Sequence, residues 1–252
     1  GLFFLKYISD RFETKYNELV EEGDGFEEDK DEYMAENIFF VPENARWNVI
    51  AAAAHTPEIG SVIDEAMRSI EKENKRLKDV LPKNFARPEL DKRRLGDVVD
   101  LFTNIQMVEH GDSKDILGRT YEYCLSKFAE QEGKLAGEFY TPHEVSQLMS
   151  EIVAHHLKDR EKIEIYDPTS GSGSLLITIG KSVAKYTKSK DDIMYYAQEL
   201  KENTYNLTRM NLVMRGIKPD NIFTRCGDTL EQDWPMYDDV TQEYNPLYLD
   251  AV

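Results

Sequence analysis

The strongest chemical signal in the sequence is a glycine-rich turn preceded by an acid. The segment Asp167-Pro-Thr-Ser-Gly-Ser-Gly-Ser-Leu-Leu176 is typical of a strand that ends in a carboxylate, a turn and a helix start. Gly171 and Gly173 allow the backbone to approach a ligand closely, and the free N–H groups of the helix start attract a carboxylate or phosphate. The pattern predicts a ligand-binding loop, to which Ser170 and Ser172 also belong.

Three other interpretations of this turn compete with that one. A dinucleotide fingerprint requires G-x-G-x-x-G/A, but Leu176 stands at the third position. A P-loop requires Gly-Lys-Ser/Thr, which the turn lacks. A plain structural turn between strand and helix stays open for the motif taken alone.

Two further acids stand where strands are predicted to end. Glu199 follows Asp167 by 32 residues, a spacing that suits one crossover. A carboxylate there can accept hydrogen bonds from both hydroxyls of a ribose, although a capping or solvated glutamate is the alternative. Asp228, in Cys-Gly-Asp-Thr-Leu, could accept from an adenine amino group, although Gly-Asp-Thr alone is more often a turn. Three consecutive strand ends with an acid favour one binding site.

The elements that must position these acids alternate between helix and strand. Helical periodicity covers residues 142–157, 173–186 and 202–216, and short apolar runs typical of strands cover 162–167, 192–199, 221–228 and 247–252. This alternation predicts an α/β fold with an open, doubly wound, Rossmann-like parallel sheet. Ligands of such sheets lie at the carboxyl ends of the strands.

The first half of the chain has helical periodicity alone. Residues 1–20 place six apolar side chains on one face, and the segment after Pro57 places five more. Helices are also expected over 89–103 and 114–130. We therefore expect an all-α domain over 1–134, a linker near 130–138 and the α/β domain over 135–252. The apolar positions concerned are Phe4, Leu5, Ile8, Phe12, Tyr16 and Leu19 in the first helix, and Ile59, Ile63, Ala66, Met67 and Ile70 in the second.

The charge balance argues against a stand-alone DNA clamp. The formal net charge is −17, and residues 21–36 hold nine acids against one lysine. The run from Lys72 to Arg94 has nine cations against four acids and could contact phosphates, but a solvated helix face is the more frequent explanation for interleaved charges.

Cysteines, histidines and apolar runs give no sign of a metal or a membrane. Cys124 and Cys226 have no metal-like spacing, and we interpret both as buried thiols in a reducing compartment. No cysteine or acid stands at metal-ligand spacing from His143, His155 or His156, so no metal is expected. No run reaches bilayer length and no signal peptide is evident, which predicts a cytoplasmic protein.

In combination, these motifs resemble adenine-N6 DNA methyltransferases, and specifically the modification subunits of type I restriction-modification systems. Asp167 to Leu176 is similar to the family's Asp-Pro-x-x-Gly-x-Gly loop, Tyr196-Ala-Gln-Glu199 to its ribose-binding strand end, and Gly227-Asp228 to its adenine-contacting turn. Segments 4–12 and 117–123 resemble the family's helical amino-terminal domain. The resemblance implies S-adenosyl-L-methionine as cofactor. It also implies contacts to the cofactor's methionine end from the segment before the first α/β helix, namely Glu138, Phe139, Tyr140, Thr141, Pro142 and His143.

The sequence departs from the family at its catalytic motif. The family's Asn/Asp-Pro-Pro-Tyr/Phe, which implies residues that hold a flipped adenine, does not occur in the 252 residues. We expect it after Val252, and we expect the chain alone to be inactive. Asn245-Pro-Leu-Tyr248 precedes the last predicted strand and lacks the second proline, so we interpret it as a turn.

The resemblance implies partners as well as chemistry. The expected partners are DNA, a specificity subunit, a second modification subunit and, in the larger complex, a nuclease subunit. Two alternatives stay open: a non-catalytic assembly module with a vestigial cofactor pocket, and a nucleotide-dependent oxidoreductase, which Leu176 disfavours.

Overall fold

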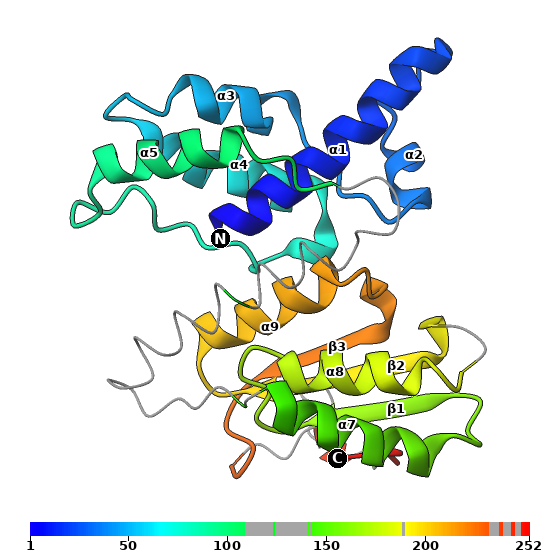
Figure 1. Ribbon diagram of the computed structural model, residues 1–252. Coiled ribbons are helices and arrows are strands. Elements are labelled where there is room, and N and C mark those ends of the chain that lie inside the picture. Colours follow the sequence, from blue (N-terminus) through cyan, green and yellow to red (C-terminus); the bar gives the residue numbers. More distant parts are fainter. Residues whose placement is uncertain are drawn as a thin grey trace. The chain divides into compact units, whose positions relative to one another are not determined.

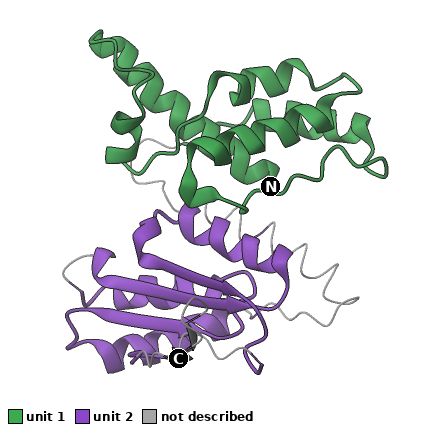
Figure 2. Cartoon of the chain, turned by 180° about the vertical axis from the view of Figure 1, so that it is seen from behind, with its two compact units in different colours: residues 1–117 green, residues 118–252 purple. Residues whose placement is uncertain are grey.

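The computed structural model describes residues 1–108, 123, 141, 143–187, 190–231, 237–238, 243–244 and 248–252. The chain divides into two compact units, residues 1–117 and 118–252 (Figure 2). The predicted linker at 130–138 and the predicted helix at 114–130 fall almost entirely outside the described residues. The boundary at residue 134 therefore stays a prediction.

Helices make up the described part of unit 1 (Figure 1). The predicted first helix is confirmed, and Phe4, Leu5, Ile8, Phe12 and Leu19 on it are buried. The five apolar residues expected after Pro57 are all fully buried too. The elements are α1 (Leu2–Glu22), α2 (Lys30–Ala35), η1 (Glu43–Ala45), α3 (Trp47–Ala52), α4 (Ile59–Glu73), η2 (Lys75–Leu77) and α5 (Lys92–Thr103).

The acidic stretch 21–36 contains a short helix, α2, that the sequence pattern did not predict. Asp29 caps it by accepting a hydrogen bond from the Asp31 N–H at 3.0 Å. Tyr33 anchors it, because its ring is fully buried between Phe12 and Phe40, with centroid distances of 4.8 and 5.5 Å. Burial raises the pKa of Tyr33 to about 12. This aromatic anchor, together with ion pairs of Glu28, Lys30 and Glu36 to other elements, orders a segment whose composition suggests only solvent.

The basic run 72–94 does not form the expected helix face. Only its ends lie in α4 and α5, and between them η2 leads into a loop. Asp79 in that loop has φ 58°, in the left-handed region that aspartate tolerates better than most residues. The helix-face interpretation is therefore wrong for residues 74–91.

Unit 2 contains the predicted parallel sheet. β1 (Ile163–Asp167), β2 (Ile193–Glu199) and β3 (Ile222–Cys226) pair in parallel in the order β1-β2-β3. Ala251 forms a parallel bridge to Ile165 on the free side of β1. The chain thus winds from β1 in both directions, which confirms the doubly wound α/β fold. A short antiparallel pair, β4 (Tyr237–Asp238) with β5 (Glu243–Tyr244), is also present.

Helices α7 (His143–Leu157), α8 (Ser174–Val183) and α9 (Glu202–Met214) lie beside this sheet (Figure 1). Alternate strand residues face them and form one apolar core. Ile163, Ile165, Ile193, Tyr195 and Ala197 belong to it, together with Leu157, Leu176 and Leu212 from the helices. No helix in the described part of the chain is long and apolar enough to cross a membrane.

In unit 1, the first turn of α4 depends on a close backbone approach. Asp64, only 2% exposed, accepts hydrogen bonds from the N–H groups of Phe85 and Ala86 at 2.9 and 3.0 Å. One turn earlier, a Cβ on Gly60 would overlap the Phe85 carbonyl and lie 2.9 Å from Ala86 Cα. The 85–86 segment therefore fits against α4 only because residue 60 has no side chain.

We expect Gly60→Ala to lower the free energy of unfolding by about 1–3 kcal/mol, the usual cost of overpacking, although alanine favours a helix by up to about 1 kcal/mol. Urea denaturation measures the difference. Ser61→Ala, at an exposed position in the same helical turn, is the matched control and should cost little. Equal stability of the two variants would contradict the close approach.

Candidate active site

The predicted acids lie at one edge of the sheet. β1 ends at Asp167 and β2 at Glu199, while Asp228 follows β3 by two residues. The register pairs Asp167 with Ala197 and Glu199 with Cys226, so the three strand ends are neighbours. This edge is the carboxyl edge, and the winding reverses between β1 and the Ala251 segment beside it. Ligands of doubly wound sheets bind at such a reversal.

Both glycines of the turn adopt left-handed backbone conformations, but for different reasons. Gly171 has φ 54° and Gly173 has φ 75°. Among the described residues, the atom nearest to a Cβ on Gly171 would be Thr169 O at 3.9 Å, whereas a Cβ on Gly173 would lie 3.0 Å from Thr208 Cγ2. Gly171 thus leaves room beside the turn, and Gly173 allows the turn to pack against α9.

Two buried polar side chains of α9 hold the carbonyl groups of the turn. Thr208 Oγ1 donates to Gly171 O at 2.6 Å, and Asn211 Nδ2 donates to Ser172 O at 2.7 Å. Thr208 Oγ1 also lies 3.3 Å from Ser170 Oγ. Sequence reasoning missed both residues. The available signal was two polar residues three apart on the face of α9 that also carries Leu212 and Met210 into the protein interior.

Glu199 holds the same turn from the other side. Its Oε2 accepts a hydrogen bond from Gly171 N at 3.0 Å, and its Oε1 accepts from Lys201 N at 3.1 Å. The structure therefore brings together the glycine turn and the predicted ribose-binding acid. A carboxylate has about four acceptor positions, so Glu199 keeps acceptor capacity beyond these two bonds.

Asp167 is a carboxylate in a desolvated setting. Desolvation raises its pKa, the N–H of Thr169, 3.0 Å from Oδ1, opposes that rise, and the negative charge of Glu199 adds to it. No lysine or arginine is among these influences. Ionisation of Asp167 therefore lowers the free energy of unfolding of the chain.

Asp228 lies in a turn tied to the other loops. Its Oδ1 accepts from Leu230 N at 2.8 Å, and Thr229 Oγ1 donates to Pro168 O at 2.5 Å. Gly227 N donates to Glu199 O at 3.0 Å. The carboxylate of Asp228 thus shapes the turn, and its predicted contact with adenine stays a prediction.

Gln198 is a further residue of the site that sequence reasoning did not single out. It is fully buried, its Oε1 accepts from Tyr166 Oη at 2.9 Å, and its Nε2 donates to Gly227 O at 3.3 Å. Its backbone carbonyl accepts from Ser170 N at 2.9 Å. One residue of β2 therefore ties together the loops that follow β1 and β3. A glutamine just before a strand-end acid is the only sequence signal for this role.

The other predicted positions are only partly described. Thr141 is half-buried and His143 is the exposed first residue of α7, whereas Glu138, Phe139, Tyr140 and Pro142 lie outside the described residues. Asn245 and Pro246 also lie outside them, and Tyr248 is 88% exposed.

The expectation for Cys226 was wrong, and Cys124 lies outside the described residues. Cys226 is exposed at the end of β3, which has only one neighbouring strand in the described sheet. Partial desolvation and the nearby charges of Glu202 and Glu199 raise the pKa of its thiol. Within the described ranges, no group of histidines, cysteines and acids could hold a metal ion.

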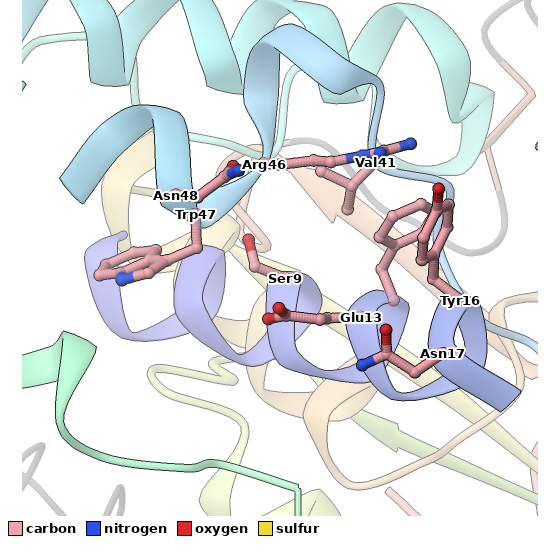
Figure 3. Close-up of a pocket in the computed structure, with 9 residues that line it drawn as sticks. Ser9, Glu13, Tyr16, Asn17, Val41, Arg46, Trp47 and Asn48 are labelled. Carbon is pink, nitrogen blue, oxygen red and sulfur yellow. The ribbon is translucent and has the colours of Figure 1, made fainter. Parts of the chain in front are cut away.

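A cavity of about 180 Å³ in unit 1 is a second candidate site (Figure 3). The guanidinium of Arg46 lies over the rings of Phe12 and Tyr16, at 5.1 and 4.7 Å, and bonds Glu28 at 2.5 Å. Ser9 points its buried hydroxyl toward the Arg46–Trp47 segment. The aromatic rings are thus already covered by a cation, and the cavity has neither the glycine turn nor the paired strand-end acids of unit 2.

Comparisons with known proteins agree with this arrangement. Residues 112–248 match the family described as N-6 DNA Methylase, and residues 1–102 match the HsdM N-terminal domain. The Type I restriction enzyme MjaIX methylase subunit of Methanocaldococcus jannaschii is 32% identical over 270 residues, which cover 100% of this chain and 47% of that protein. The HindI methylase subunit of Haemophilus influenzae is 29% identical over 200 residues, 71% of this chain and 44% of that protein.

A solved structure shows the same fold across both units. The crystal structure of the type I restriction-modification system methyltransferase subunit from Streptococcus thermophilus matches with a TM-score of 0.74 and 25% identity, over 95% of this chain and 55% of that one. This chain spans about half the length of the curated relatives it matches. The two family matches and the identity over the whole chain place this protein in the N-6 DNA methylase family, among the methylase subunits of type I restriction enzymes.

Proposed function

We propose that this chain is the cofactor-binding part of a site-specific adenine-N6 DNA methyltransferase subunit in a type I restriction-modification complex. The observation that carries the proposal is the glycine turn fixed between Glu199 and α9 at the carboxyl edge of the sheet. The family matches on both units support the same assignment.

The charges at this edge favour S-adenosyl-L-methionine over a dinucleotide. Asp167 and Glu199 are carboxylates whose hydrogen-bond donors among the described residues are backbone N–H groups. A pyrophosphate would meet the like charge of Asp167 here, whereas a sulfonium or ammonium group would neutralise it; an acid at the position of Glu199 suits the ribose of either ligand. The oxidoreductase alternative is therefore disfavoured by charge as well as by Leu176.

The residues present fit the cofactor. No described residue crowds Gly171, and Glu199 has acceptor capacity for ribose hydroxyls. Thr141 and His143, with the preceding segment 138–140 and Pro142, would contact the methionine end, and Asp228 the adenine ring. The cofactor supplies an electrophilic methyl group on sulfur. The chain's own residues bind it, orient it and fix the turn beside it.

The target base and the partners follow from the family. The amino group of adenine is out of reach inside the duplex, so the base must be flipped out. The 252 residues contain no Asn/Asp-Pro-Pro-Tyr/Phe motif, and residues that hold the base must come from elsewhere in the full protein. A specificity subunit, a second modification subunit and a nuclease subunit are the proposed partners, in the cytoplasm.

The alternative function is an assembly module with a vestigial pocket. Against it, the buried side chains of Thr208 and Asn211 hold the carbonyl groups of the turn, and no described residue crowds Gly171. Calorimetric titration of the chain with S-adenosyl-L-methionine separates the two functions, with NADH as the comparison ligand. Binding of NADH alone would favour the oxidoreductase, and binding of neither would favour the assembly module.

Glu199→Gln should weaken binding of S-adenosyl-L-methionine by about 1.5–3 kcal/mol, the usual value of hydrogen bonds to a charged group. The glutamine keeps an oxygen for Gly171 N and loses only the acceptor of the Lys201 N–H, which lies outside the turn, so the turn itself should survive. Calorimetry gives the affinity. Glu202→Gln removes the same charge from an exposed position three residues later and should bind as the unchanged chain does. An equal affinity for both variants would refute the ribose assignment.

Asp167→Asn should raise the melting temperature of the free chain and weaken cofactor binding. Because the folded-state pKa of Asp167 lies above its ordinary value of 3.8, ionisation costs stability as the pH rises through that folded-state pKa. The asparagine oxygen still accepts from Thr169 N.

The stabilisation by Asp167→Asn should therefore be largest near neutral pH and shrink as the pH falls toward 3.8. Thermal melts across this range measure it. Asp159→Asn, which removes an exposed charge, is the control. A lower melting temperature at neutral pH for Asp167→Asn than for the control would contradict the desolvated carboxylate.

A further inference from the structure

A groove in unit 1 gathers five cations around a single acid. It has a volume of about 500 Å³ and lies along the end of α4, η2 and the loop that follows. Its lining has no aromatic ring. The lining residues are Arg68, Glu71, Lys72, Lys75, Lys78 and Lys83.

The carboxylate of Glu71 holds the loop of the groove, and its negative charge is already paired with a lysine. Its Oε1 accepts from Leu81 N at 2.8 Å and its Oε2 pairs with Lys83 Nζ at 2.5 Å, while its side chain is 9% exposed. Leu77, Val80 and Leu81 are buried beneath the loop. The loop is therefore held against α4, and the positions from which its lysines extend are set before any ligand binds.

Two of the remaining cations carry charges that no ion pair in the described part of the chain balances. Lys72 and Lys75 are exposed, and neither forms an ion pair within the residues that the structure describes. Arg68 pairs with Glu65 on the solvent side of α4 at 2.9 Å. The carbonyl groups at the end of α4 favour a cation at position 72, but they do not account for Lys83, which reaches the groove from the loop. Like charges held together in this way are stabilised by a polyanion.

We propose that this groove binds the phosphodiester backbone of duplex DNA. Lysine ammonium groups neutralise phosphates without reading sequence. Proteins that hold unpaired bases stack them on aromatic rings, which this lining lacks, so the backbone is the part contacted. The choice of DNA among polyanions rests on the proposed function. In a chain with net charge −17, a fixed basic groove also determines which face can approach DNA.

The test is fluorescence anisotropy of a labelled 20-base-pair duplex titrated with the 252-residue chain over a series of salt concentrations. Lys72→Gln/Lys75→Gln keeps side-chain length and removes two charges. Lys158→Gln/Lys162→Gln removes two exposed charges from unit 2 and is the matched control. Each phosphate contact contributes about 0.9 to the slope of log affinity against log salt, so the groove variant should lose about 2 in slope, with the control changed less.

The outcomes separate this inference from the proposed function. The proposal that the groove binds DNA would be overturned by equal slopes for the two variants, or by no DNA binding of the unchanged chain at low salt. Polyglutamate that binds as tightly as DNA would also overturn it, in favour of an acidic protein partner. S-adenosyl-L-methionine affinity is measured on the same variants and should not change. If the unchanged chain did not bind S-adenosyl-L-methionine, that result would count against the proposed function and not against the groove.

Discussion

The site depends on the peptide groups of residues 170–173 being held from both sides. Glu199 accepts from the N–H of Gly171, and Thr208 and Asn211 donate to the carbonyls of Gly171 and Ser172. Left-handed turns expose peptide groups that must find partners or water, and an unsatisfied buried carbonyl costs about 1–3 kcal/mol. β2 and α9 supply these partners, so the chain passes from β1 into α8 within residues 168–173. The position of the turn against β2 and α9 follows from this arrangement.

Charge is distributed between the two units in opposite ways. In unit 2 carboxylates gather at the edge of the sheet with backbone N–H groups as partners, and desolvation raises the pKa of Asp167. In unit 1 cations gather in one groove around Glu71, although the chain as a whole carries −17. Net charge alone argues against a stand-alone DNA clamp. The net charge of the whole chain does not reveal that unit 2 has a local acidic site and unit 1 a local basic groove. A ligand within a Debye length of about 8–10 Å responds to this local charge.

Sequence patterns predicted what depends on periodicity and missed what depends on single contacts. The helices α1, α4, α7, α8 and α9, the three parallel strands and the glycine turn all came from apolar spacing and backbone requirements. The helix α2 was missed because one buried ring, Tyr33, together with ion pairs to other elements, orders an acidic segment. Gln198, Thr208 and Asn211 were missed because their partners are backbone atoms distant in sequence. Cys226 was placed wrongly because a strand pattern does not say which strand lies at the edge.

A purely structural turn would not require the combination found at this edge. Asp167 is ionised at a cost, and no described residue crowds the turn at Gly171. The desolvated charge lowers the stability of the free chain, and a ligand with positive charge would offset it. Buried hydrogen bonds from α9 keep the turn in this conformation without that ligand. The edge of the sheet is thus organised before binding, so little of the binding energy is needed to form it.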